Sequence, residues 1–120
     1  RESPAIDLVE MLLAEGCSVT AFDPAAMKRT QELLPATPTL KYANSAYEAA
    51  QDSDALLILT DWPEFAALDF DRLNKVMRYP IIIDGRNLYD PHAVAQQGFT
   101  YLSVGRPASN PVREAVLAAK

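Results

Sequence analysis

The sequence contains few of the residues on which metal and disulfide chemistry depend. Among its 120 residues there is one cysteine, Cys17, and one histidine, His92. A single cysteine cannot form an internal disulfide or a thiolate metal cluster, which fits a reducing compartment and favours a cytoplasmic location. No apolar run approaches the roughly 20 residues of a membrane span. The first residues also lack the basic start and apolar stretch of a signal peptide, so we expect no membrane partner.

Clustered positive charge is also lacking. The formal net charge is -5, with 11 Lys and Arg against 16 Asp and Glu. Because nucleic-acid affinity rests on clustered cations that neutralise phosphates, we expect no nucleic-acid partner. The apolar and charged fractions, 49% and 22%, are those of an ordinary globular protein, and the length predicts a single domain with one core. The sequence has no initiator methionine, so we expect a fragment of a larger protein.

Several catalytic signatures are missing. There is no glycine-rich dinucleotide fingerprint, no phosphate-binding loop with Gly-Lys-Ser/Thr, no Gly-x-Ser-x-Gly elbow and no paired His-Glu metal motif. Cys17 follows a helix-ending glycine at the start of a predicted strand, where we expect a small buried hydrophobic residue rather than a nucleophile. His92 lies in a predicted helix without another ligand at metal-binding spacing, so we expect it at the surface. The sequence therefore predicts no catalytic residue and no metal ligand in this chain.

What the sequence does contain is a regular alternation of short, β-rich apolar runs with helical segments. This alternation predicts the α/β class, as a three-layer, Rossmann-like open sheet of mostly parallel strands flanked by helices. Strands are predicted at 18–22, 40–42, 55–59, 81–83 and 100–104, with the continuous apolar run at 55–59 as a central strand. Helices are predicted across 71–77 and after caps at Ser3, Asp23, Asn44 or Ser45, Asp90 and Asn110. The segment 62–68 is ambiguous.

Two loops are the first places to look for a ligand, because open parallel sheets bind ligands at the carboxyl ends of their strands. One loop, at 60–65, follows the strand at 55–59, and the other, at 84–89, follows the next buried strand. In the second loop, Gly85 permits a sharp turn and Arg86 offers a planar fork of donors that suits a phosphate or a carboxylate. Arg86 is therefore a candidate anion ligand. The alternative is that Arg86 pairs with a neighbouring aspartate, Asp84 or Asp90.

Other polar and aromatic residues near these strands have simpler explanations. Trp62 and Phe65 are expected to close a core edge rather than stack on a base, and Thr60 or Asp61 to cap the next turn. Asp23 ends the second predicted element, where a classical dinucleotide fold places its ribose-binding acid. Because a proline follows Asp23 directly, N-capping is its favoured role. The residues alone thus predict an α/β domain that binds an anionic, nucleotide-like ligand through Arg86.

Four groups of residues, taken in order, extend this interpretation. They are Arg-Glu-Ser-Pro-Ala at 1–5 with Phe-Asp-Pro at 22–24, Ile-Leu-Thr-Asp-Trp-Pro-Glu-Phe at 58–65, Asp-Gly-Arg-Asn-Leu at 84–88 and Tyr-Leu-Ser-Val-Gly-Arg at 101–106. Together they resemble the carboxy-terminal, UDP-binding domain of the UDP-glucose/GDP-mannose dehydrogenase family, over nearly the whole of residues 1–120. The loops at 60–65 and 84–87 look most like the UDP-glucose branch of that family.

The resemblance implies an NAD-dependent oxidoreductase that oxidises UDP-glucose to UDP-glucuronate in two steps. A cysteine thiolate of the whole enzyme forms a thiohemiacetal with the sugar and then a thioester, which water hydrolyses. Two site residues are implied within this chain. Arg86 matches the arginine that contacts the UDP-sugar substrate, and Arg1 matches an arginine that contacts NAD across the domain junction. For Arg1, the alternative is a frayed residue at a truncated terminus.

The same resemblance implies that much of the enzyme lies outside this chain. The NAD-binding domain, the dimer-forming helix, the catalytic cysteine with its lysine and aspartate, and the first strand of this domain are not among the 120 residues. NAD is then bound mainly by the absent amino-terminal domain, and the rest of the parent enzyme is the partner of this chain. We expect the full-length protein to be a homo-oligomer and the fragment alone to be inactive.

Two alternatives stay open at this point. One is a dehydrogenase of another nucleotide sugar, GDP-mannose or UDP-N-acetylmannosamine, since the base and the sugar are read largely by residues outside this chain. The other is a non-catalytic α/β binding or interaction module, of which a receiver-like signalling domain is one version. A Phe-Lys-x-Asp segment just before Arg1, with a Gly-x-Gly-x-x-Gly domain further upstream in the parent sequence, would decide for the dehydrogenase.

Overall fold

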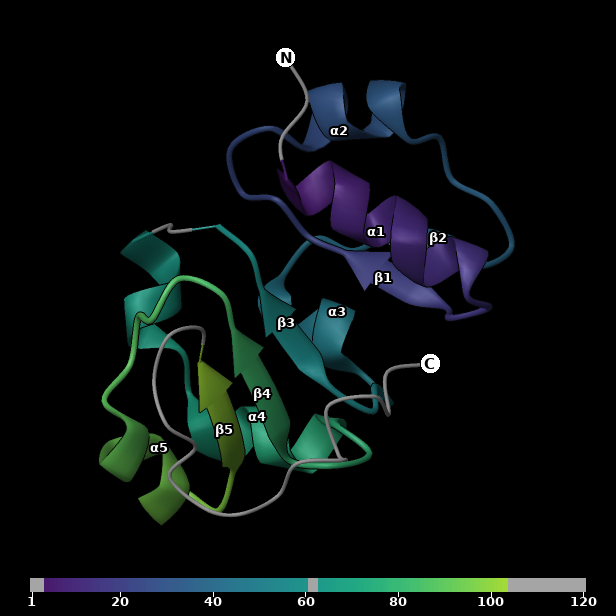
Figure 1. Cartoon of the computed structure of the whole chain (residues 1–120). Helices are drawn as coiled ribbons and strands as arrows, with labels where there is room; N and C mark the ends of the chain where they lie inside the picture. Colours follow the sequence, from purple (N-terminus) through teal and green to yellow (C-terminus); the bar gives the residue numbers. More distant parts are fainter. Residues whose placement is uncertain (1–3, 61–62, 104–120) are drawn as a thin grey trace. The chain divides into compact units, whose positions relative to one another are not determined.

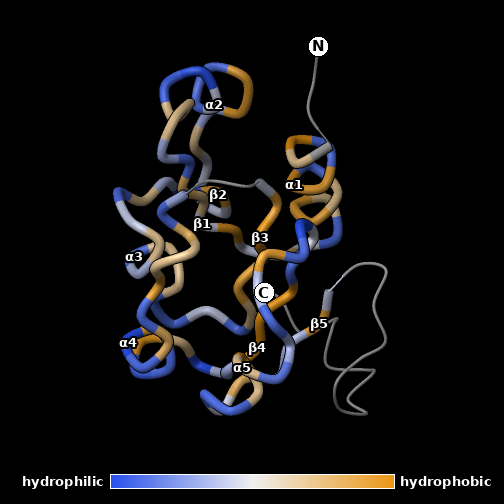
Figure 2. The backbone as a smooth tube through the Cα atoms, turned by 90° about the vertical axis from the view of Figure 1, so that its left-hand side faces the viewer, coloured by the Kyte–Doolittle hydropathy of each residue, from blue (hydrophilic) through white to orange (hydrophobic). Residues whose placement is uncertain are grey.

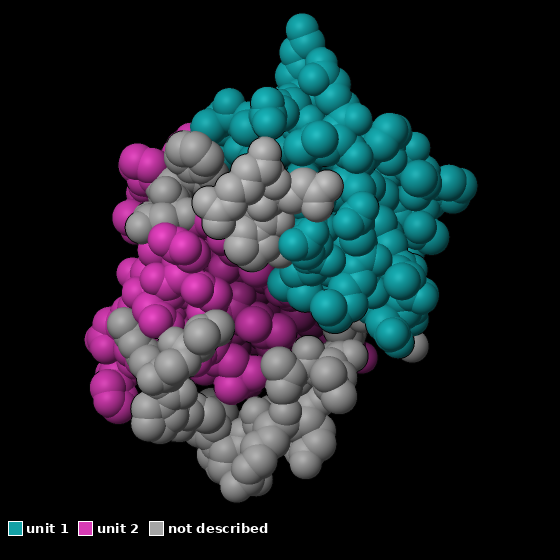
Figure 3. Space-filling model, turned by 45° about the horizontal axis from the view of Figure 1, so that its top comes forward, with its two compact units in different colours: residues 1–49, 120 teal, residues 50–119 magenta. Residues whose placement is uncertain are grey.

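Helices alternate with short parallel strands along the whole described chain (Figure 1). The structure is a computed structural model that describes residues 4–60 and 63–103. The chain divides into two compact units, residues 1–49 with residue 120, and residues 50–119, which are coloured separately in Figure 3. Each unit contains one parallel sheet, so the predicted α/β class with helices flanking parallel strands is confirmed.

The first unit is built on a two-stranded parallel sheet. Its elements are α1 (Pro4–Ala14), β1 (Val19–Ala21), α2 (Met27–Leu33), β2 (Leu40–Tyr42) and α3 (Ala46–Ala50), which ends at the boundary with the second unit. In the sheet, Val19 lies opposite Leu40 and Ala21 opposite Tyr42. Helix α1 packs against β1, and the turn between them uses Gly16 at a φ of +93°, a value that favours glycine.

Local side-chain hydrogen bonds stabilise the chain before two of these helices. Asp23 Oδ1 accepts from the backbone amides of Ala25 (3.0 Å) and Ala26 (2.9 Å) in the turn that leads into α2. The helix itself begins only after Ala26 and has no side-chain cap, so Asp23 stabilises the preceding turn, and the direct N-cap that the sequence predicts is not formed. Before α3, the Ser45 hydroxyl accepts from the Glu48 amide and the Glu48 carboxylate accepts from the Asn44 amide, each at 3.0 Å. The Ser45 contact identifies Ser45 as the cap of α3, and the Glu48 carboxylate binds the amide one residue before the cap, so the pair resembles a capping box.

The second unit is built on a three-stranded parallel sheet. Its elements are β3 (Leu56–Ile58), the 3-10 helix η1 (Pro63–Ala67), α4 (Phe70–Val76), β4 (Ile81–Asp84), α5 (Pro91–Gln96) and β5 (Thr100–Ser103). The strand order is β3-β4-β5, and a row of neighbours across it is Leu57, Ile83 and Leu102. The strands β3 and β4 consist largely of Leu and Ile, and their tubes are correspondingly orange in Figure 2. Such continuous apolar strands are typical of parallel sheets covered by helices.

Most of the buried apolar side chains of the described residues belong to this second unit. Leu73 of α4, Ile82 of β4 and Val94 of α5 are fully buried, so both helices pack onto the sheet. The remaining buried apolar residues of this unit are Ala50, Ile58, Phe65, Met77, Ile81, Phe99 and Tyr101. Among the described residues of the first unit, Leu40 and Ala43 reach the same level of burial. None of the helices in residues 4–60 and 63–103 is long and apolar enough to cross a membrane.

The observed elements differ from the predicted ones at a few points. The apolar run at 55–59 predicts a central strand, whereas in the described sheet β3 lies at an edge and β4 is the middle strand. A continuous apolar run indicates that both faces of a strand are covered, but it carries no information on the number of hydrogen-bonded neighbours. The ambiguous segment 62–68 contains η1. The predicted Ser3 cap, strand residue Val104 and terminal helix after Asn110 lie outside the described residues.

The Tyr42→Phe substitution tests a half-buried hydroxyl of the first unit. The Tyr42 hydroxyl donates to the backbone carbonyl of Leu34, and burial raises the pKa of Tyr42 above its ordinary value of 10.0. Because folding favours the neutral phenol, the stabilisation is fully present below pH 10.0 and is lost as the pH rises through the higher folded pKa. We expect Tyr42→Phe to lower the free energy of unfolding by about 1 kcal/mol at neutral pH, and the difference from the wild type to shrink at higher pH.

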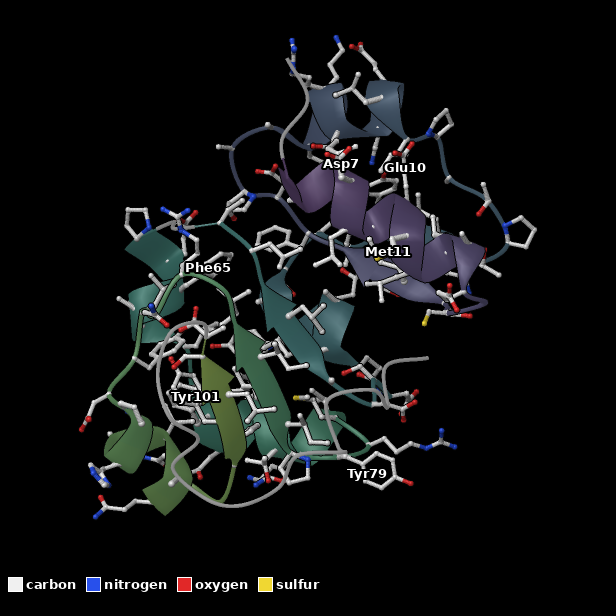
Figure 4. All side chains as sticks on the ribbon, viewed as in Figure 1. Asp7, Glu10, Met11, Phe65, Tyr79 and Tyr101 are labelled. Carbon is white, nitrogen blue, oxygen red and sulfur yellow. The ribbon has the colours of Figure 1, made fainter. Side chains whose placement is uncertain are left out.

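Denaturant unfolding at several pH values measures this difference. Tyr79→Phe is the matched control, because the Tyr79 side chain is 50% exposed and extends away from its unit (Figure 4). We expect the control to follow the wild type at neutral pH. A difference between Tyr42→Phe and the wild type that stays constant above pH 10.0 would contradict the assignment.

Candidate functional site

Two loops meet at the carboxyl ends of β3 and β4. We call residues 84–89 the Arg86 loop. The Gly85 amide donates to the carbonyl of Ile58, the last residue of β3, at 2.9 Å. The Tyr89 hydroxyl donates to the carbonyl of Phe65 in η1. The segment after β3 and the Arg86 loop are therefore joined at both ends, as expected for loops at the same edge of a parallel sheet.

The Arg86 loop is organised around a fully buried carboxylate at the end of β4. Asp84 has no exposed surface. Its Oδ1 accepts from the Arg86 amide at 2.7 Å, and its Oδ2 accepts from the Leu88 amide at 2.7 Å and from the Tyr101 hydroxyl at 2.6 Å. Three donors are thus directed at the two oxygens of one buried charge, which offsets the cost of removing that charge from water.

The Arg86 side chain is exposed at the surface of this loop. Among the residues that the structure describes, Arg86 forms no ion pair with either neighbouring aspartate. The Asp84 carboxylate is occupied by backbone amides instead, so the alternative in which Arg86 pairs with Asp84 is not observed. The next residue, Asn87, has a φ of +57°, a left-handed conformation that Asn adopts more easily than most residues. The tight turn therefore leaves the guanidinium at the surface.

A cluster of aromatic rings packs against the Arg86 loop on its inner side. Tyr89 contacts Phe70 and Tyr101 edge to face, with ring centroids 5.3 Å and 6.3 Å apart. Phe70 also contacts Phe99, with centroids 5.7 Å apart. Edge-to-face pairs of this kind are favourable beyond their buried area. The rings connect the Arg86 loop to α4 and β5, and they hold the Tyr101 hydroxyl in reach of Asp84.

The sequence predictions for other candidate residues have mixed outcomes. Phe65 is 8% exposed, as expected of a residue that closes a core edge. Trp62, Asp61 and Arg1 lie outside the described residues. His92 is exposed on α5, as predicted, and Cys17 is half-buried rather than fully buried.

Sequence reasoning missed the structural roles of Asp84, Tyr89 and Tyr101. Asp84 was considered as an ion-pair partner of Arg86, but it binds the loop backbone. A signal for Tyr101 does exist in the sequence, since a tyrosine in a buried strand requires a hydrogen-bond partner for its hydroxyl. The sequence does not say which residue that partner is.

The arrangement suits binding rather than catalysis. It presents an exposed guanidinium on a firmly held loop at the carboxyl edge of a parallel sheet, which is the geometry of an anion-binding α/β domain. In residues 4–60 and 63–103, no group of three His, Cys, Asp or Glu side chains is placed to hold a metal ion. The class that the fold and the loop define is therefore a ligand-binding α/β domain.

Comparison with known families identifies the family of this ligand-binding domain. Residues 1–91 match the family described as "UDP-glucose/GDP-mannose dehydrogenase family, UDP binding domain". The match covers well over half of the chain, and the chain belongs to this family. The family predicted from the four sequence segments is therefore confirmed.

Relatives and solved structures agree with this assignment. A UDP-glucose 6-dehydrogenase from Rhizobium meliloti is 47% identical over 107 residues, which are 89% of this chain and 24% of that protein. The UDP-glucose 6-dehydrogenase TuaD from Bacillus subtilis is 39% identical over 108 residues, which are 90% of this chain and 23% of that protein. The chain thus spans about a quarter of the length of these relatives.

The fold is also found in a related crystal structure. The NDP-N-acetyl-D-galactosaminuronic acid dehydrogenase from Methanosarcina mazei Go1 superimposes with a TM-score of 0.69 at 28% identity, over 88% of this chain and 21% of that one. A UDP-D-ManNAc dehydrogenase from Pyrococcus horikoshii, at 24% identity and a TM-score of 0.51, shares the fold. These similarities support the α/β fold across most of the chain.

The Tyr89→Phe substitution tests the connection between the two loops. It removes the hydroxyl that donates to the Phe65 carbonyl and keeps the ring and its contacts. We expect the free energy of unfolding to fall by about 1 kcal/mol, the usual net value of one hydrogen bond. We also expect faster amide hydrogen exchange in residues 63–68 and 84–89, measured by mass spectrometry. Tyr79→Phe is the control, and equal exchange in the two variants would rule out this role for Tyr89.

Proposed function

We propose that this chain, as one domain over residues 1–120, is the UDP-sugar-binding domain of an NAD-dependent UDP-glucose 6-dehydrogenase. The whole enzyme would oxidise the C6 alcohol of UDP-glucose to the carboxylate of UDP-glucuronate in two steps. Family membership supports the domain, and relatives named UDP-glucose 6-dehydrogenase at 35–47% identity favour UDP-glucose over other nucleotide sugars. The single observation that carries the proposal is the exposed Arg86 on a loop held by buried Asp84.

Arg86 would bind the diphosphate of the sugar nucleotide. A guanidinium presents several N–H donors in a plane, and two of them can donate in parallel to neighbouring phosphate oxygens. Since the ligand is a polyanion and Arg86 has no described ion-pair partner, binding does not require an internal ion pair to break first.

The oxidation itself would take place on residues outside this chain. NAD, bound by the parent enzyme, would supply the hydride acceptor for this oxidation. The relatives are about four times as long as this chain, which leaves room for a separate cofactor domain and for a segment with the catalytic cysteine. The role of this chain in both steps is to bind and orient the diphosphate end of the substrate. We further propose a cytoplasmic location and a homo-oligomeric parent enzyme.

Substitution of Arg86 in the parent enzyme tests the binding role. A charge-assisted contact is worth about 1.5–3 kcal/mol, so we expect Arg86→Ala to weaken UDP-glucose binding by about 10- to 150-fold. Arg86→Lys keeps the charge but not the planar fork, and it should restore part of the affinity. Isothermal titration calorimetry with UDP and UDP-glucose measures both variants.

A cation elsewhere on the same unit serves as the control for this experiment. Lys75 is exposed in the last turn of α4, and Lys75→Ala removes one positive charge from the protein. We expect its affinity for UDP-glucose to match the wild type. If Arg86→Ala also binds UDP-glucose like the wild type, the ligand role of Arg86 is wrong.

Arg1 would contact NAD, the cofactor of the parent enzyme. Support comes from its place within the family match, over residues 1–91, and from the positive charge that a dinucleotide diphosphate requires. We expect Arg1→Ala in the parent enzyme to raise the KM for NAD by about tenfold and to leave the KM for UDP-glucose unchanged. Steady-state kinetics with each substrate varied in turn measures this, and a change in the KM for UDP-glucose alone would argue against the assignment.

A further inference from the structure

The backbone amides of the Arg86 loop are used inside the protein. The Gly85 amide donates to Ile58, and the amides of Arg86 and Leu88 donate to Asp84. Many anion sites consist of successive backbone amides directed at the ligand. In this loop those three amides already have acceptors within the protein, which leaves the exposed Arg86 side chain as the candidate anion-binding group.

We propose that Asp84 is a positioning residue for Arg86: by binding the amides of Arg86 and Leu88, it fixes the loop backbone so that the Arg86 guanidinium meets the diphosphate. This inference rests on the proposed function of Arg86. The inference goes beyond that function because it assigns the geometry of the site to Asp84, a residue that does not touch the ligand.

The surroundings of Asp84 suit such a role. Asp84 is the last residue of β4, the middle strand of the three-stranded sheet, so it stands on a rigid element. Its second oxygen also accepts from the hydroxyl of Tyr101, a residue of β5 that is 2% exposed. The Tyr101 ring packs against Tyr89, at the far end of the same loop. The Asp84 carboxylate is thus held from the strand, from the loop amides and from the Tyr101 hydroxyl.

A fixed backbone matters for a long, exposed side chain. Arginine loses much rotamer freedom when it binds a ligand, and this loss opposes binding. A loop that already holds the Arg86 backbone in the bound conformation adds no further ordering cost. If the amides of Arg86 and Leu88 lost their acceptor, the loop would sample more conformations and fewer of them would present the guanidinium correctly.

The positioning role of Asp84 and its negative charge predict opposite effects of Asp84→Asn on ligand binding. A buried carboxylate near a diphosphate repels it, so charge alone predicts that removal of the negative charge strengthens binding. Positioning predicts the reverse, because an amide in place of the carboxylate offers one acceptor oxygen instead of two. Asp84→Asn removes the charge, keeps the shape, and so separates the two effects.

The test measures steady-state kinetics of the full-length parent enzyme. We expect Asp84→Asn to raise the KM for UDP-glucose about tenfold, with kcat changed by less than about twofold and the KM for NAD unchanged. Tyr101→Phe deletes one donor to the same carboxylate and should raise the KM for UDP-glucose by about threefold. If Asp84→Asn does not fold, Tyr101→Phe decides the question by the same split between KM and kcat.

Asp54→Asn is the matched control for a general loss of stability. Asp54 is also a buried aspartate of the second unit, at 6% exposure, and its Oδ1 lies 3.4 Å from Nη1 of Arg78. It precedes β3, at the end of the strand opposite to the Arg86 loop. We expect Asp54→Asn to lower the melting temperature without a change in the KM for UDP-glucose. An equal rise in KM for Asp54→Asn and Asp84→Asn would overturn the proposal.

The double variant with Asp84→Asn and Arg86→Ala separates the positioning role of Asp84 from the ligand role of Arg86. If Asp84 acts through Arg86, Asp84→Asn has no further effect on the KM for UDP-glucose in the Arg86→Ala background. A full tenfold rise there, or a lower KM for Asp84→Asn alone, overturns the positioning role. If Arg86→Ala raises KM but Asp84→Asn and Tyr101→Phe do not, Arg86 binds the ligand without help from Asp84. If Arg86→Ala leaves KM unchanged, both proposals fail.

Discussion

The buried carboxylate of Asp84 connects the scaffold of the second unit to its surface. A charge without exposed surface is stable in a protein when several donors replace the water it has lost. The amides of Arg86 and Leu88 and the hydroxyl of Tyr101 supply those donors from a loop and from a neighbouring strand. The Asp84 carboxylate therefore holds both the loop backbone and the Tyr101 hydroxyl. Because Asp84 is itself the last residue of a packed strand, the position of the Arg86 backbone depends on how that strand packs.

Parallel strand topology explains why the site lies where it does. The strands β3, β4 and β5 run in the same direction, so their carboxyl ends share one edge, and there the segment that holds η1 lies beside the Arg86 loop. The Gly85 amide and the Tyr89 hydroxyl then join neighbouring segments, and the aromatic rings fill the space beneath them. A sequence that alternates apolar strands with helices thereby brings residues distant along the chain to one surface.

Local patterns in the sequence were sufficient for most of the described elements and for the position of the loop that carries Arg86, but not for the hydrogen bonds that hold this loop. The strand at 40–42, the Asp90 and Pro91 start of α5 and the place of the 84–89 loop after a buried strand follow from residue types and short spacings. The partnership of Asp84 with Tyr101, 17 residues apart, depends on how two strands pair, which short spacings do not encode. The position of β3 at an edge of its sheet was missed for the same reason, since hydrophobicity reports burial and not neighbours.

The inward direction of the loop amides limits what this part of the molecule can discriminate. A single guanidinium that meets a diphosphate binds a group common to all nucleotide sugars, and it cannot tell one base or one hexose from another. Selectivity for the sugar then requires hydrogen-bonding groups shaped to its hydroxyls, supplied from other segments of the enzyme. The contact that Arg86 would make is then directed at the part of the substrate that all nucleotide sugars share.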